Sequence, residues 1–183
     1  GIKVSADGML KALQYIYLSR VAVDYTDPDD GAQHKGWSFR YSLQGGATHT
    51  SFALAAAGTS VLHGLSEYDT TVVNEALNYV YACSMGYGED ARRGGWNEGF
   101  PYYTHLYASQ AIYHGSTDRR WRNYYKKTAN WLRSQFMWID AADHSKGGHF
   151  AGAIDRPYSK TYYTSIACLI LQIPYEYLPI YQR

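Results

Sequence analysis

The sequence predicts an all-α fold, an α/α toroid or half of one, with three antiparallel helix hairpins forming an inner and an outer helix layer. One observation is a repeated pattern of small, apolar, amide and aromatic residues, which occurs at residues 12–17, 76–81 and 128–133. After each copy comes a glycine followed by an aromatic residue or a histidine, and then a more apolar helical stretch. Helix pairs that recur in this way stack, because one pair cannot bury its own apolar face.

The outer helices are expected at about residues 6–22, 69–83 and 118–135. In the first of them Leu10, Leu13 and Ile16 recur at helical spacing and form one apolar face. Between the first outer helix and the first inner helix, residues 24–46 are rich in turn formers such as Pro28 and Gly31. We therefore expect that segment to be a loop.

The inner helices are expected at about residues 48–65, 102–114 and 160–172. From Phe52 to Leu62 the first of them is small or apolar nearly all round, so it must be buried on all sides. The last one ends before Pro174, since proline cannot continue a helix. The predicted order is outer helix then inner helix, three times over.

Length and charge limit the classes of protein to consider. A chain of 183 residues suits one domain with a sizeable core. Its formal net charge of +1 argues against nucleic acid or an anionic membrane as partner, and no stretch is long and apolar enough to span a bilayer. We expect residues 1–183 to form a single toroid-like domain. Because the chain begins with Gly1 and not with an initiator Met, we expect this domain to be the C-terminal part of a longer protein. The cellular location stays open.

Two internal motifs and the C-terminus resemble a known family. Gly94-Gly95-Trp96 leads to the helical residues 107–111, and Gly147-Gly148-His149 leads to residues 163–167. This arrangement resembles the repeats shared by squalene and hopene cyclases and by protein prenyltransferase β subunits. Residues 169–183 look like the C-terminus of bacterial proteins that carry these repeats without an assigned reaction. The resemblance covers nearly the whole chain and implies a terpenoid cyclase-like α/α toroid, either as half of a longer chain or completed by a homodimer.

The catalytic motifs of that family are poorly matched. Asp27-Pro28-Asp29-Asp30 spells the Asp-x-Asp-Asp acid of triterpene cyclases, but it precedes its glycine corner, so a plain acidic turn is the favoured interpretation and Asp29 is a weak catalytic candidate. The zinc ligands of the prenyltransferases are absent near Tyr163, so no cofactor is expected. A zinc site made by His49, His105 and His149 is the weaker alternative. The other weak catalytic candidates are His105, Glu98 and Asp155.

Aromatic residues are unusually frequent, with 20 Tyr, 5 Trp and 5 Phe. They predict a ligand site lined by aromatic faces at the corners and at the starts of the inner helices. The candidate ligand-binding residues are Trp37, Arg40, Tyr41, His49, Trp96, Tyr102, Tyr103, His105, His149, Tyr162 and Tyr163.

Three functions follow from these observations. The first is a repeat domain without catalysis that binds a small hydrophobic ligand, a sugar-like ligand or a protein segment in its aromatic concavity. The second is a terpenoid cyclase-like enzyme that acts through a carbocation. The third is a carbohydrate-active α/α toroid, a lyase or a glycosidase, because these enzymes also collect aromatic and charged residues at one mouth. Fold alone does not separate the three.

Overall fold

A computed structural model describes residues 5–44, 49–65, 67, 70–92, 100–152 and 159–177 of the chain. The described part contains six α-helices. They are α1 Ala6–Leu18, α2 Phe52–Gly64, α3 Thr71–Met85, α4 Pro101–Gly115, α5 Asp118–Gln135 and α6 Lys160–Gln172. The strands are β1 Arg20–Thr26, β2 Gln33–Phe39, β3 Phe136–Trp138 and β4 Gly148–Phe150. Short 3₁₀ turns are η1 Glu89–Arg92, η2 His144–Lys146 and η3 Ile173–Tyr175.

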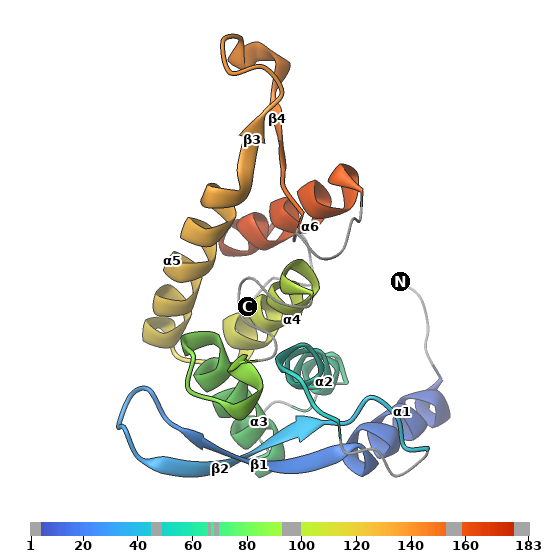
Figure 1. Cartoon of the computed structure of the whole chain (residues 1–183). Coiled ribbons are helices and arrows are strands. Elements are labelled where there is room, and N and C mark those ends of the chain that lie inside the picture. The colour runs from blue at the N-terminus through green and yellow to red at the C-terminus, as the bar shows by residue number, and fades with distance from the viewer. Residues whose placement is uncertain are drawn as a thin grey trace.

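The predicted all-α toroid is wrong as a fold class, because the structure is mixed. Two antiparallel two-stranded sheets, β1-β2 and β3-β4, accompany the helices. In Figure 1 the first hairpin runs along one end of the molecule, and the second projects from the opposite end, beyond α5 and α6. The first hairpin replaces the end of the expected first helix and part of the loop after it, and the second hairpin includes the expected corner at Gly148-His149.

The β1-β2 hairpin forms where a helix end and a loop were predicted. Val21, Val23 and Tyr25 alternate along β1, and Val23 and Tyr25 are buried. β-branched and aromatic residues at a period of two favour a strand over the last turn of a helix, so α1 ends at Leu18. The turn is closed by Asp27, whose Oδ1 accepts a hydrogen bond from the Asp29 backbone N–H at 2.8 Å.

The β3-β4 hairpin continues directly from α5. Phe136 pairs with Phe150 and Trp138 with Gly148 in antiparallel register. A Cβ added at Gly148 would lie 2.2 Å from the ring of Phe136, so a side chain is excluded at this position by packing. The predicted corner at Gly148-His149 is therefore the start of β4, packed against the aromatic residues of β3.

The helices start where short hydroxyl side chains can cap them. Ser51, Thr70, Thr117 and Ser159 precede α2, α3, α5 and α6, and each side chain accepts a hydrogen bond from a backbone N–H in the first turn. Such caps satisfy donors that a helix cannot satisfy internally. Helix α4 is central, packing against α2, α3, α5 and α6. Of the helices that the structure describes, none has the length and apolar character needed to cross a membrane.

Candidate functional site

Two of the predicted ligand-binding aromatics are core residues. Tyr102 and Tyr163 are buried, and their ring centroids lie 4.9 Å apart. The ring of Trp131 is tilted against that of Tyr102, with centroids 5.2 Å apart. The Tyr102 hydroxyl donates a hydrogen bond to the Ala151 carbonyl at 2.6 Å. Tyr162 is half-buried and packs edge-on to Tyr163. These rings join α4, α5 and α6 to one another and line neither of the two pockets described below.

His105 is also a core residue. It is completely buried in α4, and its Nδ1 lies 3.0 Å from the hydroxyl of Tyr124. Burial, and to a smaller extent the charge of Lys127, lower the pKa of His105 to about 3. An imidazole that stays neutral and shielded from solvent does not suit acid-base catalysis on a ligand. His49 is exposed and His149 lies on β4.

The three histidines are not assembled into a metal site. Across the residues that the structure describes, no three His, Cys, Asp or Glu side chains stand close enough together to hold a metal ion. The three-histidine arrangement considered from sequence is therefore not one that this fold brings together.

Asp29 belongs to an ion-pair network. Its two carboxylate oxygens accept hydrogen bonds from Arg119 at 2.8 Å and from Arg120 at 2.6 Å. Partial burial alone would raise the pKa of Asp29, but the hydrogen bonds from Arg120 and Arg119 outweigh it and hold the pKa below its usual value. A carboxylate held in its ionised form is unsuited to protonating an alkene. The acidic-turn interpretation fits this geometry.

The remaining candidates are scattered. Trp37 donates its indole N–H to Glu75 at 2.7 Å, and the Arg20 guanidinium lies over its ring. Arg40 is half-buried beside the Arg20 carbonyl, whereas Tyr41 is exposed. Tyr103 packs on Tyr107, with their ring centroids 4.8 Å apart. Trp96, Glu98 and Asp155 lie outside the described residues.

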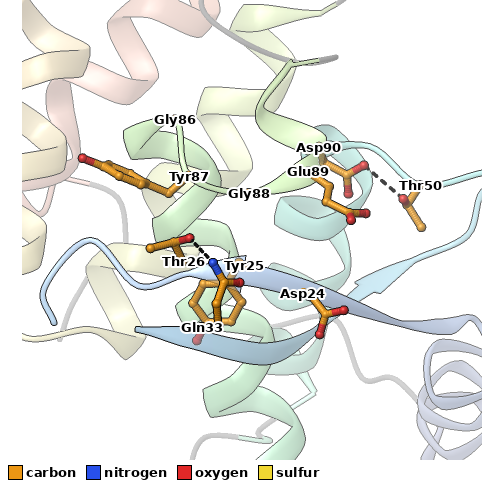
Figure 2. A pocket seen from close by; sticks show the side chains of 10 residues that line it. All are labelled: Asp24, Tyr25, Thr26, Gln33, Thr50, Gly86, Tyr87, Gly88, Glu89 and Asp90. Atoms are coloured by element: carbon orange, nitrogen blue, oxygen red, sulfur yellow. Dashed lines mark hydrogen bonds between the residues drawn. The ribbon is translucent and has the colours of Figure 1, made fainter. Parts of the chain in front are cut away.

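A polar pocket of about 580 Å³ opens between β1, the start of β2 and the loop that follows α3 (Figure 2). Gly86 leaves α3 in the left-handed region, with a φ of 100°, and Gly88 then bridges to Tyr25 of β1. A Cβ at Gly88 would lie 2.2 Å from the Cys83 sulfur, so only glycine fits there. This tight loop places Glu89 and Asp90 at the pocket.

Hydrogen bonds fix the polar side chains of this pocket. Buried Asp90 accepts from the hydroxyls of Ser38 at 3.1 Å and Thr50 at 3.0 Å. The amide of Gln33 donates to the Thr26 hydroxyl at 2.6 Å, as Figure 2 shows. Asp24 and Glu89 are exposed. None of the described lining residues is basic, so the pocket offers hydrogen-bond acceptors and negative charge.

A second, aromatic pocket of about 780 Å³ lies where α5, the β3-β4 hairpin and the end of α6 meet. Five aromatic rings and Leu171, Ala129 and Arg133 line it; the rings belong to Tyr125, Phe136, Trp138, Phe150 and Tyr175. The hydroxyl of Tyr125 donates to the Leu171 carbonyl at 3.1 Å, which turns the polar end of that side chain to the backbone. The described lining is therefore largely apolar, with one guanidinium.

The aromatic pocket is stiffened by contacts among its own rings. Phe136 lies edge-on to Phe150 and to Trp138, at centroid separations of 5.3 and 4.9 Å. The ring of Trp138 is also stacked on that of His144 of η2, with centroids 4.0 Å apart. Rings held in this way form a wall before any ligand arrives, which lowers the ordering cost of binding.

None of the lining residues of the aromatic pocket was among the sequence candidates. A signal was available: Phe136 and Trp138 alternate with Met137 directly after α5, as on one face of a strand. The contribution of Phe150, Leu171 and Tyr175 depends on how the hairpin and α6 pack against α5, and no local pattern reveals it.

Comparisons with known proteins found no similar protein. The chain matches no protein-family model, no curated protein and no solved structure. The resemblance to the squalene cyclase and prenyltransferase repeats therefore stays an expectation from the sequence.

Proposed function

We propose that this domain binds an apolar group of a ligand or a protein in the aromatic pocket between α5, the β3-β4 hairpin and α6. The observation that carries the proposal is the lining of that pocket, with five aromatic side chains around about 780 Å³. Pockets of this size and character are typical of ligand sites, because burying apolar surface contributes about 25 cal/mol per Å². The described lining of this pocket includes no Asp or Glu, and the candidate Asp29 lies elsewhere, so we favour binding over catalysis.

A pocket-filling variant tests this proposal. N-Phenyl-1-naphthylamine is uncharged and becomes fluorescent in apolar surroundings, so its titration reports access to the pocket. We expect the wild-type protein to bind it and Ala129→Phe, which places a ring inside the pocket, to bind at least about tenfold more weakly, equivalent to about 1.4 kcal/mol.

Ala12→Phe is the matched control, because Ala12 is exposed on α1. It should bind the probe like the wild-type protein, and circular dichroism should show all three proteins folded. Equal binding by Ala129→Phe, or no binding by the wild-type protein, would contradict the proposal.

A second candidate function is binding of a hydroxyl-rich cation, such as an amino sugar, in the polar pocket. The favouring observation is that its described lining combines three carboxylates with hydroxyl and amide groups and no basic side chain. We expect glucosamine to shift the amide NMR signals of this pocket at lower concentration than glucose. Asp24→Asn should remove that difference, whereas Asp7→Asn, an exposed change on α1, should retain it. Absence of shifts with both sugars would sink the idea.

A further inference from the structure

A basic stripe on α5 leads into the aromatic pocket. Arg122, Lys126 and Arg133 are exposed and follow one another at spacings of four and seven residues. Ala129, which lines the pocket, lies between the last two at helical spacing. Residues separated by four, seven and eleven positions share one face of a helix, since a turn takes about 3.6 residues. The stripe therefore ends at Arg133, which is itself part of the pocket lining.

Within the described part of the chain, the three cations of the stripe form no ion pair. The other basic residues of α5 are engaged: Arg119 and Arg120 bind Asp29, and Lys127 donates to the Ser84 carbonyl. By contrast, none of the ion pairs formed among the described residues involves the stripe. A formal net charge of +1 for the whole chain conceals this local excess of positive charge.

The face of the β3-β4 hairpin opposite Phe136 and Trp138 also carries apolar side chains. Met137 and Ile139, on either side of Trp138 along the projecting hairpin, are 54 % and 63 % exposed. Exposed apolar side chains of this size are typical of protein interaction surfaces. A free small molecule would fill the pocket but would leave the stripe and the hairpin uncovered.

We infer that this surface binds an acidic peptide segment of another protein, with an apolar anchor in the aromatic pocket and carboxylates along Arg133, Lys126 and Arg122. The inference rests on the proposed function, since the anchor occupies the same pocket. From Arg122 to Arg133 the helix rises about 16 Å, a length that about five extended peptide residues cover. The partner therefore has one or two large apolar residues followed by about five residues rich in Asp and Glu.

The experiment uses displacement of N-phenyl-1-naphthylamine by short synthetic peptides. The main probe is an acetylated peptide of two leucines followed by five glutamates. One comparison peptide replaces the glutamates by glutamines, and another lacks the leucines. We expect the leucine-glutamate peptide to displace the dye about tenfold better than either, and to lose most of that advantage in 0.5 M NaCl because salt screens exposed charges.

Charge-removal variants locate the effect. Arg122→Gln/Lys126→Gln should weaken the leucine-glutamate peptide about tenfold and should leave dye binding unchanged, because neither side chain lines the pocket. Lys160→Gln, which removes one exposed charge from the start of α6, should have no effect.

Three results would overturn the inference. Equal displacement by the glutamine peptide would show that the pocket binds apolar groups but that the basic stripe does not favour acidic peptides. The proposed function would then stand without the inference. Equal displacement by the leucine-free peptide, or by a heparin fragment, would show a non-specific anion surface. Failure of the dye itself to bind would remove the proposed function, and the inference with it.

Discussion

At the scale of single residues, burial decides the chemistry of His105. Its ring contacts those of Phe52 and Tyr124, and its Nδ1 is hydrogen-bonded to the Tyr124 hydroxyl. The pKa of about 3 in the folded protein is well below the value of about 6.5 expected for an unfolded chain. Between these two values the unfolded state binds more protons than the folded state, so stability must rise with pH across that window.

The contribution of His105 to stability is thus fully present above about pH 6.5 and is lost as the pH falls toward 3. At pH 4.5 we expect the loss from this residue to be on the order of 3 kcal/mol. Urea unfolding at a series of pH values measures it. His105→Asn keeps a short amide near the Nδ1 position but cannot be protonated, so its stability should fall less steeply between pH 6.5 and 4.5. The same slope in this variant as in the wild-type protein would contradict the prediction.

At the scale of elements, the helices were predicted and the strands were missed. The expected range 160–172 coincides with α6, and 118–135 with α5, because each has a hydroxyl cap before it and apolar positions at helical spacing. The range 6–22 was too long, since Val21 and Val23 alternate in β1 rather than continuing the helical stripe of α1. A short alternation beside a strong helical pattern is easily assigned to the helix.

Gly36 shows why the first hairpin was missed. A glycine next to Trp37 looks like a chain corner, but Gly36 lies in β2, opposite Val23. A Cβ at this position would approach the Cβ of Tyr79 on α3 to 2.9 Å. The glycine is thus required by a tertiary contact between β2 and α3, which local sequence does not encode.

For the candidate site, the sequence indicated an aromatic lining but not the residues that form it. Aromatic abundance indicated a pocket lined by rings, and such a pocket exists, but with different residues. Tyr102 and Tyr163, near the starts of α4 and α6, pack against each other in the core. Phe136 and Trp138 line the pocket instead. Which rings remain accessible depends on how the hairpin packs beside α5, and that follows from the whole fold.

At the scale of the whole molecule, the first hairpin is fastened to α5, some ninety residues later in the chain. Arg120 makes ion pairs with Asp27 at 2.9 Å and Asp29 at 2.6 Å, and its guanidinium lies over the ring of Tyr81. A further hydrogen bond reaches Asn78 on α3 at 2.6 Å. One side chain therefore joins three elements that Figure 1 shows meeting at the same end of the molecule.

Removing Arg120 should therefore loosen the entire fold. Arg120→Ala leaves the buried carboxylate of Asp27 without its counter-ion, and breaking a largely buried pair costs about 3 kcal/mol. Arg119→Ala is the matched control, because Arg119 binds the same Asp29 from a side chain that is 62 % exposed, and an exposed pair contributes less than about 1 kcal/mol. Urea unfolding at neutral pH compares the two variants. Equal losses of stability would show that burial of the Arg120 clamp does not matter, and that the hairpin is held by its apolar contacts with α3 instead.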